Sequence, residues 1–81
     1  MVTVQVAVYA TLRAYLAEAK LGQAVSVTLP EGTTVTQLLE EKLGIPRKEV
    51  KIVFVNGVSR KGGYALAAGD RVAVFPPIGG G

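Results

Sequence analysis

Valine at every second position is the feature that most restricts what the start of this chain can fold into. The residues concerned are Val2, Val4, Val6 and Val8, and other side chains fill the places between them. A period of two with β-branched residues on one face is typical of a strand. The same alternation predicts strands over residues 25–29 and 71–75. Because 81 residues can bury only one core, these strands should belong to one small domain.

Two segments between the strands follow a helical period instead. Over residues 12–20, apolar side chains recur at intervals of three and four, at Leu12, Tyr15, Leu16 and Ala19. This spacing forms one face of a helix, which Gly22 should end. Over residues 35–43 the same spacing recurs, at Val35, Leu38, Leu39 and Leu43. The sequence therefore predicts two helices.

The second predicted helix has signals at both ends. Thr34 and Gln37 have the spacing of a capping box, in which each side chain satisfies a free backbone amide of the first turn. Gly44 favours the left-handed conformation that ends a helix, and Pro46 prevents the helix from continuing.

The run of residues 52–55 is wholly apolar, so we expect a central strand covered on both faces. Asn56 and Gly57 tolerate positive φ, which predicts a tight hairpin turn to a short partner strand at residues 58–59. The pattern of residues 64–66 does not distinguish a strand from a loop.

The resulting order of elements is strand, helix, strand, helix, strand, short strand, strand. Strands with helices on one face indicate an α+β domain of two layers. The first two strands would pair only awkwardly if the helix that separates them in sequence also packs between them.

The absence of cysteine and histidine excludes several chemistries. The chain has no disulfide, no thiolate metal site, and neither the usual general base nor the usual nitrogen ligand for a metal. A self-sufficient hydrolase is therefore not expected. The net charge of +3, from nine Lys or Arg and six Asp or Glu, favours anionic partners only weakly.

Membranes and nucleic acids are not expected partners. The chain contains no run of 18 apolar residues that could span a bilayer, and its start has a strand pattern rather than that of a signal peptide. No aromatic residues are interleaved with basic ones in the way that base stacking requires. We therefore expect a cytoplasmic protein.

The last residues of the sequence have the properties of a tail. Pro76 and Pro77 lack a backbone amide and should end the last strand, and Gly79, Gly80 and Gly81 have no side chains to pack. We expect this tail to be flexible and to enter a narrow slot in a partner. There it would present the carboxylate of Gly81.

At this point a family resemblance becomes visible. Residues 69–81, with the ending Phe-Pro-Pro-Ile-Gly-Gly-Gly, resemble the C-terminus of the small subunit of molybdopterin synthase, the MoaD family of ubiquitin-like sulfur carriers in the MoaD/ThiS superfamily. Residues 8–13 resemble that family's first strand and helix start, and residues 55–57 its central hairpin. Arg71 stands where the family usually has an acidic residue, and Gly79 replaces a more typical Ala, Ser or Thr.

The resemblance implies a β-grasp, ubiquitin-like fold. A mixed sheet packed against helices would occupy residues 1–76, and residues 77–81 would form the flexible sulfur-carrying tail. An E1-like adenylyltransferase would use ATP and Mg to join AMP to the carboxylate of Gly81, and a sulfur donor would displace AMP to leave a thiocarboxylate.

The resemblance also implies the partner and the product. The tail would enter the large subunit of molybdopterin synthase, in a heterotetramer with two copies of each subunit. It would give its sulfur to cyclic pyranopterin monophosphate during molybdenum cofactor biosynthesis. The chain would bind no cofactor or metal and would not be catalytic on its own.

Gly81 is the predicted reactive residue. The other predicted tail or partner-binding residues are Phe75, Pro76, Pro77, Ile78, Gly79 and Gly80. Phe75 either joins a docking patch or covers the edge of the domain's own core. We interpret the remaining candidates as ordinary structural residues, with Val72 and Val74 in the core, Tyr9 and Tyr15 at its edge, and Arg60, Lys61 and Arg71 on a solvated face.

Three other functions remain open. A sulfur carrier for thiamine or for tRNA thiolation would share the tail chemistry, although such relatives usually lack the helix predicted over residues 12–20. A ubiquitin-like modifier would instead join Gly81 to lysines of target proteins. An interaction domain with an inert tail is the plain alternative.

Overall fold

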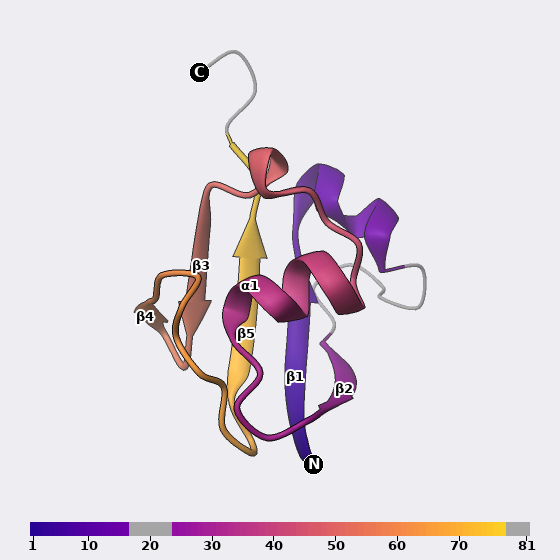
Figure 1. The fold of residues 1–81 in the computed structure, drawn as a ribbon. Coiled ribbons are helices and arrows are strands. Elements are labelled where there is room, and N and C mark those ends of the chain that lie inside the picture. Colours follow the sequence, from indigo (N-terminus) through magenta and orange to yellow (C-terminus); the bar gives the residue numbers. More distant parts are fainter. Residues whose placement is uncertain (17–23, 78–81) are drawn as a thin grey trace.

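The computed structural model describes residues 1–16 and 24–77, in which five strands form one sheet (Figure 1). In chain order the elements are β1 (Val2–Val8), η1 (Ala10–Tyr15), β2 (Val25–Leu29), α1 (Val35–Gln37), η2 (Leu38–Lys42), η3 (Arg47–Glu49), β3 (Ile52–Val55), β4 (Val58–Ser59) and β5 (Arg71–Phe75). Of the helical elements, η1 and η3 are 3₁₀ helices and η2 is π-helical.

The order of the strands across the sheet is β2-β1-β5-β3-β4. The last strand, β5, lies in the centre, where it runs parallel to β1 and antiparallel to β3. The helix formed by α1 and η2 crosses one face of this mixed sheet (Figure 1). This arrangement is the β-grasp, ubiquitin-like fold that the family resemblance implied.

The first two strands pair directly, because the condition for an awkward pairing is not met. β1 and β2 are antiparallel neighbours, with Val4 opposite Val27. The pairing is unobstructed because η1 lies beyond the end of β1 and not between the strands (Figure 1).

The expected position of the 52–55 strand was wrong. β3 lies between β5 and the short β4, so it is not the centre of the sheet. Val53 and Val55 are buried, whereas Ile52 and Phe54, on the other face, are only half-buried. The run is wholly apolar because its second face belongs to an open apolar surface and not to a second packed layer.

The first predicted helix is shorter than expected and of another type. The chain forms the 3₁₀ helix η1 from Ala10, and Leu16 has already left helical geometry. Tertiary contacts fix this turn, since Leu12 is fully buried and the Tyr15 hydroxyl donates a hydrogen bond to Glu49. Residues 17–23, which include the rest of the predicted helix and its Gly22 stop, lie outside the described residues.

The second helix begins and ends where the sequence predicts. Thr34 accepts from the Gln37 amide, and the Gln37 side chain accepts from the Thr34 amide, so the capping box is complete. Gly44 has a φ of +68°, and the Ile45 amide reaches back to the Leu39 carbonyl to close the last turn. The expected hairpin is also present, since β3 and β4 pair antiparallel, and its turn residues Asn56 and Gly57 both have positive φ.

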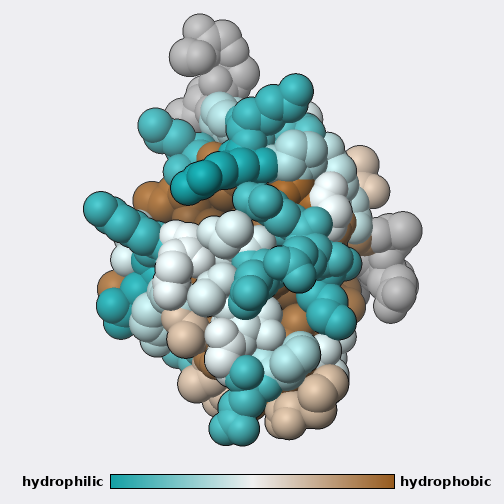
Figure 2. Space-filling model, in the orientation of Figure 1, coloured by the Kyte–Doolittle hydropathy of each residue, from teal (hydrophilic) through white to brown (hydrophobic). Residues whose placement is uncertain are grey.

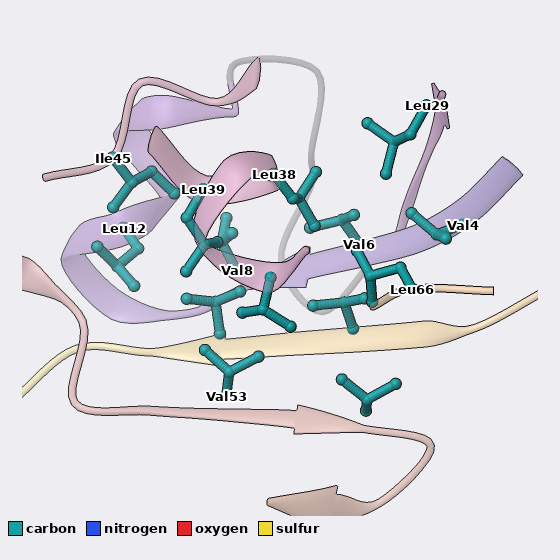
Figure 3. Packing of buried hydrophobic residues seen from close by; sticks show 14 residues of the cluster. Val4, Val6, Val8, Leu12, Leu29, Leu38, Leu39, Ile45, Val53 and Leu66 are labelled. Carbon is teal, nitrogen blue, oxygen red and sulfur yellow. The ribbon is translucent and has the colours of Figure 1, made fainter. Parts of the chain in front are cut away.

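The core lies between the sheet and the helices. Figure 2 shows the helix-bearing side of the molecule, where polar side chains surround a strip of apolar surface. Beneath that surface, aliphatic residues from every layer meet, among them Val6, Leu12, Leu38, Ile45 and Val53 (Figure 3). Val72 and Val74 belong to the same cluster, as expected.

Candidate functional site

The face of the sheet opposite the helices carries three aromatic side chains. Tyr9 follows β1, Phe54 lies in β3 and Phe75 ends β5. Each is next in sequence to a buried valine, so the alternation of strand side chains places the aromatic residue on the other face. We call these three residues the aromatic cluster, and the surface that carries them the open face.

The aromatic cluster is held by ring–ring contacts. The rings of Tyr9 and Phe75 stack with centroids 4.5 Å apart and an interplanar angle of 5°. The Phe54 ring meets Phe75 edge-on, at 5.8 Å and 86°. Such pairs contribute about 0.5–1.5 kcal/mol beyond their buried area. Phe75 is therefore the centre of the cluster.

Phe75 is also fixed through its backbone. The Lys51 amide donates to the Phe75 carbonyl at 2.8 Å, and the Tyr9 amide donates to the Val74 carbonyl at 3.2 Å. Strands on both sides therefore fix the end of β5. Pro76 has no amide with which to continue the ladder, so the chain leaves the sheet at its centre, beside the aromatic cluster.

A shallow apolar groove runs along this exit. Its lining residues come from the ends of three strands, the start of η1 and the start of the tail, and they are Tyr9, Ala10, Thr11, Lys51, Ile52, Phe54, Phe75, Pro76 and Pro77. Lys51 is the only charged residue among them. An open groove of this composition is suited to binding an apolar partner surface.

One side-chain hydrogen bond joins the two short helices η1 and η3. The Tyr15 hydroxyl donates to Glu49 Oε2 at 2.5 Å and so joins η1 to η3. This hydrogen bond, followed by burial and by the negative charge of Glu49, raises the pKa of Tyr15 above its ordinary value.

The structure separates the predicted site residues into two groups. Phe75, Pro76 and Pro77 lie together on the groove. Phe75 is on the open face and is absent from the core cluster and its packed neighbours. Of the two roles considered for it, this position favours the docking patch over a cover for the edge of the core. Ile78, Gly79, Gly80 and Gly81 lie outside the described residues.

The sequence interpretation missed two members of the cluster. Tyr9 was expected at the core edge but lies on the open face, and Phe54 was expected in a strand covered on both faces. Tyr15, in contrast, packs at the core edge as expected. The alternation of side chains along a strand could have identified them. Each aromatic residue is next in sequence to a core valine of its strand and therefore points to the opposite face of the sheet. Arg60, Lys61 and Arg71 are exposed, as expected.

The described residues hold no group of three or more acidic, histidine or cysteine side chains that could bind a metal ion. No helix within residues 1–16 and 24–77 is long and apolar enough to cross a membrane. What the geometry offers is a binding surface beside the start of a tail.

Comparison with protein families matches residues 1–79 to Mut7-C ubiquitin. The chain belongs to the Mut7-C ubiquitin family. Its fold accordingly resembles solved ubiquitin-like proteins over nearly its whole length. None of the proteins with curated functions matches it.

Two solved relatives bear on more than the fold of this Mut7-C ubiquitin protein. SAMP1 from Haloferax volcanii is 25% identical with a TM-score of 0.72, over 98% of this chain and 99% of that one. A Pyrococcus furiosus protein, provisionally assigned as subunit 1 of molybdopterin converting factor, is 28% identical with a TM-score of 0.73, over 96% and 100%. The protein is thus a small ubiquitin-like protein related to SAMP1 and to MoaD-type carriers.

A second crystal structure supports the fold alone. The small archaeal modifier protein 1 of H. volcanii superposes with a TM-score of 0.74 at 23% identity, over 96% of this chain and 100% of that one.

Proposed function

We propose that this Mut7-C ubiquitin protein is a sulfur carrier that serves as the small subunit of a molybdopterin synthase. The observation that carries the proposal is the position of Gly79, Gly80 and Gly81. They follow the central strand β5 after only three residues, and β5 ends at the aromatic cluster. The similarity to the P. furiosus protein supports this choice.

In the proposed reaction the chain supplies a carboxylate and partners supply the chemistry. An E1-like enzyme with ATP and Mg joins AMP to the Gly81 carboxylate and releases pyrophosphate. Hydrosulfide delivered by a sulfur donor attacks the carbonyl carbon and AMP leaves, which produces the thiocarboxylate. Transfer of that sulfur to cyclic pyranopterin monophosphate, with water supplying the replacing oxygen, regenerates the carboxylate.

The open face has a separate role in this proposal. An apolar partner surface covers the groove around Phe75, and burial of this area drives docking. Because β5 is hydrogen-bonded on both sides, Pro76 and Pro77 leave from a fixed point. Glycine has no Cβ, so a partner's slot can close directly on the backbone of residues 79–81.

The test is the intact mass of the protein purified from its own host. We expect a fraction whose terminal Gly81 has one carboxylate oxygen replaced by sulfur. The same mass also identifies the last residue of the chain in the cell. If ATP, the activating enzyme and a sulfur source still leave the mass unchanged, the carrier proposal is wrong.

A second measurement identifies the pathway. The thiocarboxylated protein, mixed with a molybdopterin synthase large subunit and cyclic pyranopterin monophosphate, should lose its sulfur and form molybdopterin. Loss of sulfur only with a thiamine-thiazole or tRNA thiolation system would assign the carrier to that pathway instead.

The relationship to SAMP1 favours one further candidate, a protein modifier. In that case Gly81 would form an isopeptide bond with lysine side chains of other proteins. Lysates digested with trypsin would then contain lysines that carry a C-terminal fragment of this chain. The carrier proposal predicts that such adducts are absent.

A further inference from the structure

A second groove lies away from the aromatic cluster, between the α1–η2 helix and β3. Its walls come from this helix, from η3, from β3 and from the loop after β4. In Figure 2 a strip of apolar surface beside the helix is crossed by polar side chains. This second groove shares only Lys51 and Ile52 with the groove of the open face. We call the second groove the basic groove.

The basic groove concentrates positive charge. Among the described residues its lining includes Arg47, Lys51, Arg60 and Lys61, four of the nine Lys and Arg residues of the chain. Only Glu40, one of six acidic residues, lies among them. Since the whole chain has a net charge of only +3, this local excess attracts a negatively charged ligand.

The loop that carries two of these cations is held in place. The Arg60 amide donates to the Val53 carbonyl at 3.0 Å, and the Thr36 amide donates to the Gly62 carbonyl at 2.9 Å. The Arg60 guanidinium lies 4.6 Å from the centroid of the Tyr64 ring. A cation–π contact of this kind orients the charged group before a ligand arrives. Less conformational entropy is then lost on binding.

The aliphatic floor of the basic groove favours an acidic peptide over a nucleic acid as its ligand. It is aliphatic, with Leu39, Val50 and Val53 below the charged rim, and no aromatic ring lines it. A nucleic acid would therefore find cations for its phosphates but no ring on which to stack a base. A peptide with an aliphatic side chain between carboxylates matches both the floor and the rim.

We propose that the basic groove binds a short acidic peptide segment of a partner protein, with one aliphatic side chain on the floor and carboxylates paired with Arg47 and Arg60. This inference does not depend on the proposed sulfur-carrier function. It assigns the protein a second contact surface, separate from the aromatic cluster.

The test titrates the ¹⁵N-labelled full chain with an N-acetylated, C-amidated hexapeptide of sequence Asp-Glu-Leu-Leu-Asp-Glu. We expect saturable binding with a Kd below about 1 mM. The amide signals of Thr36, Lys61 and Gly62 should shift, and that of Ala73 on the open face should not. R47Q and R60Q should each weaken binding about three- to fivefold, because each removes one rim ion pair.

Matched controls separate the groove from general electrostatics. R13Q removes the same type of charge from an exposed residue outside the groove and should leave the affinity unchanged. A peptide with serine in place of leucine should bind at least fivefold more weakly. Melting temperatures of the three variants confirm that they remain folded.

Several results would overturn the proposal. One is the absence of saturable binding, and another is a set of shifts centred on Phe54 and Phe75. Equal weakening by R13Q would indicate attraction without a site. Tighter binding of a single-stranded oligonucleotide than of the peptide would identify the groove as a nucleic-acid site.

Discussion

Tyr15 illustrates how one side chain can connect two short elements. Its hydroxyl donates to Glu49, and this contact raises the pKa of Tyr15 above its ordinary value of about 10. In the unfolded chain the contact is absent, so there the hydroxyl loses its proton at lower pH. The stabilisation by this contact is therefore complete below about pH 10 and is lost as pH rises through the pKa of the folded protein.

The variant Y15F tests this linkage. We expect the melting temperature of the wild type to fall more steeply than that of Y15F as the pH rises above about 10, because only the wild type has this proton to lose. Other titrating groups are common to both proteins and cancel in the difference. Parallel curves for the two proteins would show that the hydrogen bond does not form in solution.

Asp70 is a buried carboxylate with a structural task. One of its oxygens accepts from the Asn56 side chain at 2.9 Å, and the other accepts from the Ala67 amide at 2.8 Å. Asn56 in turn accepts from the Arg71 amide. The network joins the β3–β4 hairpin to the start of β5.

We expect D70A to lower the free energy of unfolding by about 2–4 kcal/mol, since the variant leaves the Asn56 amide and the Ala67 amide without a partner. D70N retains one acceptor and should lose roughly half as much. Urea denaturation measures both. A loss below about 0.5 kcal/mol in D70A would mean that water replaces the carboxylate at no cost.

At the scale of elements, the contact between the 60–64 loop and the start of α1 depends on a glycine. A Cβ built on Gly62 would lie 2.1 Å from Thr36 Oγ1, whereas one on Gly63 would meet nothing within 4 Å. G62A should therefore destabilise the fold by about 1 kcal/mol, because Thr36 must leave its rotamer or the loop must move. G63A is the matched control and should be neutral or slightly stabilising.

Thr36 provides the second half of this test. If the clash is the cause, the penalty of G62A should nearly disappear in a T36A background, as a double-mutant cycle measured by thermal unfolding would show. An unchanged penalty would assign the cost to the backbone of residue 62 instead.

The elements also show what sequence can and cannot predict. The capping box at Thr34 and the hairpin at Asn56 are local chemistry, and both were predicted correctly. The shortening of the first helix and the pairing of β1 with β2 depend on contacts between distant segments, such as that of Tyr15 with Glu49. No local pattern specifies such contacts.

The candidate site follows the same division. Phe75 was identified because it adjoins the tail. Phe54 was missed because a wholly apolar run favours burial on both faces. Only the position of β3 in the sheet shows that its second face is open, since the helices within residues 1–16 and 24–77 lie on the other side (Figure 1). An apolar face that the fold leaves uncovered is therefore a sign of function that sequence periodicity alone misreads.

At the scale of the whole molecule, the proposed function divides docking from chemistry. The open face would bind the partner, and the glycines after Pro77 would carry the sulfur. Deletion of Gly80 and Gly81 should therefore abolish sulfur transfer. It should leave the melting temperature nearly unchanged, because glycines have no side chains to contribute to packing.

The matched contrast is F54S, which changes the open face and keeps the tail. We expect F54S to be thiocarboxylated in the presence of the activating enzyme only at raised protein concentration, since weaker docking raises the concentration needed and leaves the carboxylate intact. The lost edge-on contact with Phe75 should cost roughly 1 kcal/mol of folding free energy. Rates measured over a range of carrier concentrations separate the two defects. The deletion should remain inactive at every concentration, whereas F54S should recover as concentration rises. A deletion variant that still transfers sulfur would refute the role of Gly81.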